Sequence, residues 1–135
     1  MKATILIVED HDAVRTSLRD WLSSSFPECC FLEAKSGEEA VDLTCAQPPD
    51  IVLMDIGLPR MNGVEATTRI KAIRPQTQVV MLTIHEASRY RADAATAGAS
   101  AYLLKRRMHT ELIPAMTKLL SGLADYSPGP PPQKE

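Results

Sequence analysis

The stretch from Ile51 to Asp55 reads Ile-Val-Leu-Met-Asp, an apolar run from Ile51 to Met54 that is closed by a carboxylate. It lacks the alternation of apolar and polar residues that a half-exposed strand shows, and it is therefore typical of a strand covered on both faces. Similar runs predict four further strands, at Thr4 to Val8, Cys29 to Ala34, Val79 to Leu82 and Ala101 to Leu104.

The segments between these runs carry apolar residues at helical spacing, as at Val14, Leu18, Trp21 and Leu22, at Ala66, Ile70 and Ile73, and at Leu112, Met116, Leu119, Leu120 and Leu123. Five strands that alternate with helices predict an α/β fold with a parallel sheet, right-handed crossovers and helices on both faces. In such a sheet, ligands bind beyond the carboxyl ends of the strands.

Residues typical of helix ends flank these segments. Pro75 is expected to end the third helix and Gly98 the fourth. Pro114 falls near the start of the last helix, so we expect that helix to begin late, with Thr110 as its cap and Pro114 in the first turn, where no N–H is needed. The other expected caps are Asp12, to which we assign no chemistry, Ser36 with Glu39, and Asn62 with Glu65.

The length and composition suit one domain, since 44% of the 135 residues are hydrophobic. A net charge of -2 leaves no broad basic surface, so nucleic-acid binding by this segment alone is not expected. The three cysteines lack metal-site spacing and are expected to be reduced residues of the core. No apolar run near the start could serve as a signal or span a membrane, so we expect a cytoplasmic chain. Residues 1–123 should form the domain and the proline-rich residues 124–135 a tail or truncated linker.

Polar residues follow the strands that should end at the same edge of the sheet. They are Glu9 and Asp10 after the first strand, Asp55 after the third, Thr83 at the end of the fourth and Lys105 after the fifth. Three clustered carboxylates would repel one another without a cation. Mg²⁺ suits a shallow site of oxygen ligands, and a cation, an ammonium group and a hydroxyl together can stabilise a phosphoryl group.

Asp55 is then the expected nucleophile, and it would form an acyl phosphate. Each residue has an ordinary explanation when taken alone: Asp55 as a turn former, Lys105 as a solvated charge and Thr83 as a strand-end residue. Their occurrence in order on consecutive strand ends favours the functional interpretation.

With these residues in place, the chain resembles the receiver domains of two-component response regulators from Lys2 to about Gly122. Four segments carry the resemblance: Ile-Leu-Ile-Val-Glu-Asp-His at 5 to 11, Asp-Ile-Gly-Leu-Pro-Arg-Met-Asn-Gly at 55 to 63, Met-Leu-Thr at 81 to 83, and Gly-Ala-Ser-Ala-Tyr-Leu-Leu-Lys at 98 to 105. The resemblance implies a flavodoxin-like (βα)5 receiver fold with strand order 2-1-3-4-5.

The resemblance also implies roles for individual residues. Asp55 would take a phosphoryl group from a phosphohistidine on a sensor histidine kinase, and the domain would catalyse only its own phosphorylation and autodephosphorylation. Mg²⁺, for which Mn²⁺ can substitute, would be bound by Asp10, Asp55 and the backbone carbonyl of Gly57, with Glu9 acting through a water. The remaining roles would be phosphoryl contacts by Thr83 and Lys105, a switch formed by Thr83 with Tyr102, and a loop shaped by Pro59 and Gly63.

Within the family, the chain looks most like the NarL/LuxR-type regulators, because Val14 and Arg15 follow the Glu-Asp-His motif and Tyr90 follows Leu-Thr-Ile-His. Such regulators bind DNA through a domain that follows a linker, and that domain is absent from this chain. We therefore expect a receiver cut from a transcription factor, with a single-domain regulator as the less favoured alternative. We expect the fourth helix, with Ala92, Ala94, Ala95 and Ala97 toward the core, to shift on phosphorylation. A homodimer could form through the fourth helix, fifth strand and last helix.

Some positions depart from the family pattern. Arg106 follows Lys105 where a proline or acidic residue is usual, and Ile84 is larger than the small residue expected after Thr83. Gly57 and His85 occupy the two variable positions that flank the site. Two alternatives stay open: a phosphatase with an aspartyl-phosphate intermediate, which the missing Asp-x-Asp motif disfavours, and a receiver-like module that signals without phosphate.

Overall fold

The protein, seen in a computed structural model that describes residues 3–84 and 88–123, has five parallel strands in one sheet of order β2-β1-β3-β4-β5. This confirms the predicted fold and strand order. Three strands differ slightly from the predicted bounds. The strand β2 begins one residue later than predicted, and β3 and β4 extend further. The strands are β1 (Thr4–Val8), β2 (Cys30–Ala34), β3 (Ile51–Asp55), β4 (Gln78–Thr83) and β5 (Ala101–Leu104).

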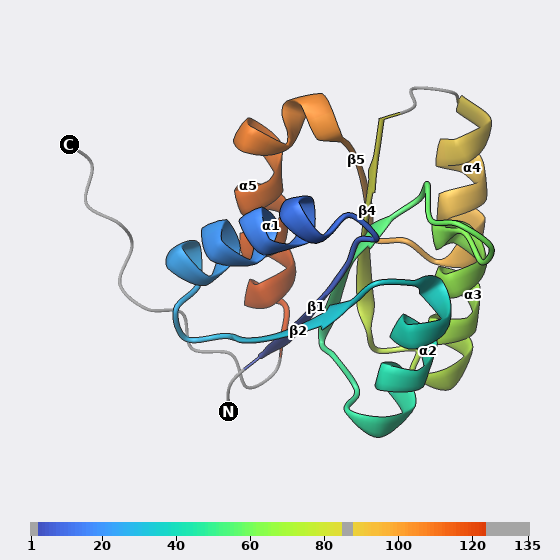
Figure 1. The fold of residues 1–135 in the computed structure, drawn as a ribbon, viewed down its shortest axis with the longest axis horizontal. Coiled ribbons are helices and arrows are strands. Elements are labelled where there is room, and N and C mark those ends of the chain that lie inside the picture. Colours follow the sequence, from blue (N-terminus) through green and yellow to red (C-terminus); the bar gives the residue numbers. More distant parts are fainter. Residues whose placement is uncertain (1–2, 85–87, 124–135) are drawn as a thin grey trace.

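The helices cover both faces of the sheet (Figure 1). On one face lie α1 (Asp12–Ser25) and α5 (Met108–Ser121), and on the other α2 (Gly37–Ala46), α3 (Gly63–Ile73) and α4 (Ser88–Ala97). A short 3₁₀ turn, η1 (Lys105–Arg107), joins β5 to α5. Among the described residues, no helix combines the length and apolarity needed to span a membrane.

Alternation along the strands divides the core into two layers. In β1, Ile5 and Ile7 pack toward α1 and α5, whereas Leu6 and Val8 pack toward α2, α3 and α4. All four side chains are almost completely buried. The absence of polar residues from Ile5 to Val8 follows from this burial on both faces.

Two of the predicted helix caps, Ser36 and Asn62, are confirmed, and two, Asp12 and Thr110, are wrong. Ser36 Oγ accepts a hydrogen bond from the Glu39 amide, and Asn62 Oδ1 accepts one from the Glu65 amide. Asp12, however, is the first residue of α1, and the N-cap is His11. The Asp12 carboxylate instead accepts a 2.7 Å bond from Arg15, because this guanidinium competes for it within the first turn.

The helix ends near Pro75 and Gly98 are confirmed, since α3 and α4 end at Ile73 and Ala97. Gly98 has a φ of 102°, a left-handed conformation that favours glycine.

The predicted late start of α5 is wrong. The helix begins at Met108, directly after η1, and Pro114 lies inside it. Pro114 has no N–H to donate to the carbonyl of Thr110, four residues earlier. Because Pro114 is exposed, water can reach that carbonyl instead. A proline within a helix costs about 3 kcal/mol, whereas burying one large apolar side chain contributes about 1.5–3 kcal/mol. The buried row of Leu112, Met116 and Leu120 runs through the proline and outweighs its cost.

The expected burial of α4 is only partly right. Ala94 is fully buried and Ala97 half-buried, but Ala92 and Ala95 are exposed. Successive helical residues are turned by about 100°, so neighbours such as Ala94 and Ala95 cannot both face the core. The expectation that the cysteines lie in the core is right only for Cys29, since Cys30, on the edge strand β2, and Cys45 are exposed. The tail at 124–135 and His85 lie outside the described residues.

Candidate functional site

The pairing register of the strands places the polar residues at one edge of the sheet. Val8 pairs with Met54 and Asp55 with Leu82, so the residues that follow β1 lie level with the end of β3. Thr83 pairs with Leu104, which places Lys105 just beyond the end of β4. This edge is the one predicted from the sequence.

Lys105 joins two of the predicted carboxylates. Its Nζ lies 3.2 Å from Glu9 Oε2 and 3.3 Å from Asp55 Oδ2. Glu9 and Asp55 are almost fully buried, with 1% and 7% of their surface exposed. One ammonium group therefore faces two carboxylates from different strands, and the cluster retains an excess of negative charge.

The charged groups in the cluster shift one another's pKa values. Burial raises the pKa of Asp55, and the neighbouring Glu9 raises it further against the opposing hydrogen bond from Gly57 and the charge of Lys105. Burial also acts to raise the pKa of Glu9, but the hydrogen bond from His11, the contact with Asp55 and the charge of Lys105 outweigh it, so that the pKa is lowered. The surroundings thus favour the ionised form of Glu9 and disfavour that of Asp55.

Asp10 completes the group of acids that a cation would require. It is half-buried, and its Oδ1 is shielded from solvent without a hydrogen-bond donor among the described residues. His11 Nδ1 lies 3.3 Å from this oxygen without forming a hydrogen bond to it, so the oxygen can accept a metal ion without first losing such a bond. The residues present therefore fit a hard divalent cation, since oxygen donors of this kind are what Mg²⁺ prefers.

The loop after β3 packs closely against Asp55. The Gly57 amide donates a 3.0 Å hydrogen bond to Asp55 Oδ1. Arg60 has a φ of 61°, and the Gly63 amide donates to the Ile56 carbonyl at 3.2 Å, which closes the loop at the start of α3. The role of the Gly57 carbonyl as a metal ligand stays a prediction.

Thr83 and Tyr102 lie on the α2–α3–α4 face of the sheet. Met81 and Tyr102 are paired neighbours that pack on that face, and Thr83 follows Met81 by two residues. Thr83 is fully buried, and the Arg91 guanidinium lies 4.8 Å from the centre of the half-buried Tyr102 ring. Their predicted switch role is not tested by these contacts, although the shared face is the one that the role requires.

His11 has no role among those predicted from the sequence. Its Nδ1 lies 2.8 Å from Glu9 Oε1 and 3.3 Å from Asp10 Oδ1. The position directly after two acids, at the same strand end, is the signal that could have drawn attention to it.

Arg15, which is 7% exposed, likewise has no role predicted from the sequence. Its Nη1 donates to the Glu9 carbonyl at 2.9 Å, and its Nε donates to Glu33 at 3.2 Å. Arg15 therefore holds the backbone beneath the acidic residues. Its spacing from Leu18 and Leu22 on the buried face of α1 is the signal that could have found it.

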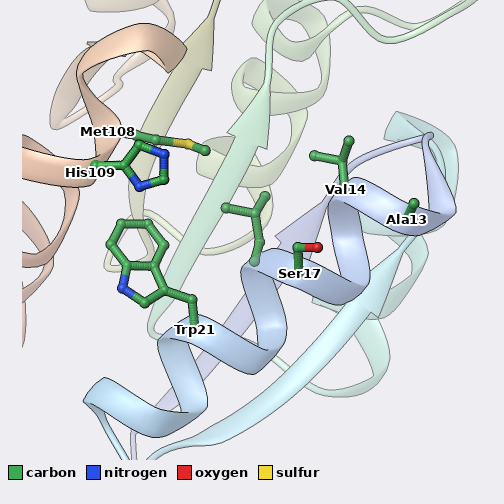
Figure 2. A pocket seen from close by; sticks show the side chains of 7 residues that line it. Ala13, Val14, Ser17, Trp21, Met108 and His109 are labelled. Atoms are coloured by element: carbon green, nitrogen blue, oxygen red, sulfur yellow. The ribbon is translucent and has the colours of Figure 1, made fainter.

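A separate, mostly apolar groove lies between α1 and the start of α5 (Figure 2). Trp21 and His109 face each other across it, with ring centres 5.7 Å apart. The groove contains no carboxylate, and it is therefore not the cation site. Its lining residues are Ala13, Val14, Ser17, Leu18, Trp21, Met108 and His109.

Similarity to proteins of known sequence agrees with this geometry. The chain is 35% identical to the transcriptional regulatory protein DegU of Brevibacillus brevis over 127 residues, which are 94% of this chain and 54% of DegU. It is 36% identical to the response regulator protein VraR of Staphylococcus aureus over 130 residues, covering 95% of this chain and 61% of VraR. The chain thus spans somewhat more than half the length of these relatives.

Similar structures and a family model point the same way. A LuxR-family two-component response regulator from Aurantimonas sp. SI85-9A1 superposes with a TM-score of 0.84 at 34% identity, covering 90% of this chain and 87% of that one. The response regulator domain of CheB from Thermotoga maritima gives 0.74 at 27% identity, covering 87% and 92%. The model of the response regulator receiver domain matches residues 5–117. The chain therefore belongs to the response regulator receiver domains.

Proposed function

We propose that Asp55 accepts a phosphoryl group from a phosphohistidine on a sensor histidine kinase, and that the added charge acts as a switch. The observation that carries this proposal is the position of the buried Asp55 carboxylate, 3.3 Å from Lys105 Nζ and beside Glu9. In the transfer, the bond between phosphorus and the histidine nitrogen breaks as an Asp55 oxygen bonds to phosphorus. The released imidazole takes a proton from solvent.

Mg²⁺, or Mn²⁺ in its place, would be bound by Asp10, Asp55 and the Gly57 carbonyl, with Glu9 acting through a water. The cation would supply positive charge that offsets the repulsion between the carboxylates and the incoming phosphoryl oxygens. The solvent-shielded Oδ1 of Asp10, which accepts no hydrogen bond from the described part of the chain, supports this assignment. Lys105 provides a fixed charge, and its contacts with Asp55 and Glu9 raise its pKa although burial alone would lower it.

The signal would leave the site through Thr83 and Tyr102. A hydroxyl group drawn toward the phosphoryl group would vacate space beneath α4, and the Tyr102 ring could fill it. Their shared face of the sheet and the contact between Arg91 and Tyr102 support this route. The α4–β5–α5 surface would then bind a partner domain or a second receiver.

The family consists of signalling domains rather than metabolic enzymes, so the only catalysis proposed is self-phosphorylation and autodephosphorylation. The similarity to the transcriptional regulatory protein DegU and to VraR supports control of transcription, through a DNA-binding domain outside this chain, in the cytoplasm. A single-domain regulator is the alternative.

Incubation with acetyl phosphate and Mg²⁺, followed by intact-mass measurement, tests the proposal. We expect one base-labile but acid-stable phosphoryl group per chain, which is absent in EDTA and in the Asp55→Asn variant. Asp50→Asn is a matched control, because Asp50 is a half-buried aspartate that contacts Arg74 before β3 begins. Full labelling in EDTA or in Asp55→Asn contradicts the proposal.

A further inference from the structure

His11 lies at the acidic pocket but has no task in the proposed function. Its Nδ1 faces both carboxylates that follow β1, at 2.8 Å from Glu9 Oε1 and 3.3 Å from Asp10 Oδ1. The backbone amide of His11 also donates to Glu9 Oε1 at 3.3 Å. The side chain is 71% exposed, so a solute can reach the ring while these acceptors hold it in place.

The three side chains are spaced like neighbouring ligands of a small cation. For metal–ligand bonds of about 2.1 Å, adjacent ligand atoms lie about 3.0 Å apart in an octahedron and about 3.4 Å apart in a tetrahedron. The two distances from His11 Nδ1, 2.8 and 3.3 Å, are close to these values. One ligand atom from each of Glu9, Asp10 and His11 lies within 4.8 Å of the others.

We propose that His11 makes this pocket a binding site for borderline transition-metal cations, represented by Zn²⁺, with one imidazole nitrogen and the Glu9 and Asp10 carboxylates as ligands. Imidazole is a preferred ligand of Zn²⁺, whereas Mg²⁺ prefers oxygen atoms and keeps its waters. His11 thus discriminates between two classes of cation. The inference rests on the proposed function in one respect, namely that the acidic pocket binds cations.

The two classes of cation compete for the pocket, because both need Asp10. Lys105 contacts Glu9 Oε2, which leaves Oε1, the oxygen beside His11, toward the proposed Zn²⁺ ligands. Zn²⁺ bound there prevents Asp10 from binding Mg²⁺. Phosphorylation that depends on Mg²⁺ therefore slows as Zn²⁺ rises, and His11 sets the Zn²⁺ concentration at which it does so.

The test measures the Zn²⁺ and Mg²⁺ affinities of the same protein samples by calorimetric titration, with the wild type compared with His11→Ala. We expect His11→Ala to weaken Zn²⁺ binding at least about ten-fold, since even outer-shell partners of a metal contribute about that much. Mg²⁺ affinity should change less than about three-fold. His109→Ala is the matched control, because His109 is an exposed histidine in the α1–α5 groove.

A second readout follows the histidine ring nitrogens by ¹⁵N NMR during addition of Zn²⁺, and we expect the largest shift at His11. Equal Zn²⁺ affinity in the wild type and His11→Ala overturns the inference. So does a loss that appears on His85→Ala in place of His11→Ala. A wild type that does not bind Mg²⁺ contradicts the proposed function instead, while the Zn²⁺ titration still decides the role of His11.

Discussion

Gly63 packs directly against the end of β3 and Asp55, so its size affects both the stability of the fold and the geometry of the site. A Cβ added at this position would lie 2.5 Å from the Asp55 carbonyl oxygen, 2.8 Å from Ile56 Cα and 3.0 Å from Met54 Cγ. Two of these atoms belong to the backbone of β3 and the residue after it. The clash therefore cannot be relieved by a side-chain rotation, and either α3 or the end of β3 must move.

Helix propensity and packing make opposite predictions for Gly63→Ala. Alanine is favoured over glycine within a helix by about 1 kcal/mol, and Gly63 is the first residue of α3. Overpacking against a rigid neighbour costs about 1–3 kcal/mol or more. Because the neighbour here is backbone, we expect a net loss of about 1–3 kcal/mol in the free energy of unfolding. Mg²⁺ binding should weaken as well, since Asp55 is displaced.

Urea unfolding followed by circular dichroism measures this loss, and Gly122→Ala is the control. A Cβ at Gly122 meets its nearest atom, the Leu119 carbonyl oxygen, at 3.4 Å. We therefore expect Gly122→Ala to change the free energy of unfolding by less than about 1 kcal/mol, with either sign. A Gly63→Ala variant as stable as Gly122→Ala would refute the close packing of α3 against Asp55.

Three further predictions concern the metal, the switch and a cysteine. Asp10→Asn should weaken Mg²⁺ binding at least about ten-fold more than Glu9→Gln does, as measured by calorimetric titration. The reason is that Asp10→Asn removes a direct ligand, whereas Glu9→Gln removes a water-mediated one. Equal losses would mean that the two roles are wrongly assigned. Thr83→Ala should leave Asp55 able to accept phosphate but abolish the hydrogen-exchange changes that beryllofluoride, a phosphoryl mimic, produces in residues 88–104. Changes confined to α2 in the wild type would contradict the proposed route through Thr83 and Tyr102. Burial raises the pKa of Cys29 to about 12, so iodoacetamide at about pH 8 should modify the two exposed cysteines and spare Cys29 until the protein unfolds. Because this pKa is raised, the stability gained by burying the neutral thiol is present below about pH 9 and is lost as the pH rises toward 12; rapid modification of Cys29 in the folded protein would contradict its burial.

Much of the fold could be predicted because strong local signals agreed with the tertiary structure. The apolar runs became strands, of which β1, β3 and β4 are buried on both faces, and Ser36 and Asn62 cap helices as expected. The acidic edge followed from the fold, since parallel strands bring Glu9, Asp55 and Lys105 together whatever the details of the loops.

The errors arose where a tertiary contact outweighed a local rule. Asp12 was predicted to cap α1, but its carboxylate forms an ion pair with the buried Arg15 instead. Pro114 looked like a residue of the first turn, but the row of apolar side chains on α5 keeps the helix continuous through it. His11 went unassigned because its contacts with Glu9 and Asp10 depend on how the chain turns after β1.

Phosphorylation of Asp55 is the central claim, and chemical trapping tests it most directly. Sodium borohydride reduces an aspartyl phosphate to homoserine, which tandem mass spectrometry locates in the sequence. After treatment with acetyl phosphate and Mg²⁺, we predict homoserine at position 55 and no homoserine at Asp10 or Asp50. Homoserine at another position, or a phosphoryl group that borohydride leaves intact on a serine, threonine or histidine, would contradict the claim.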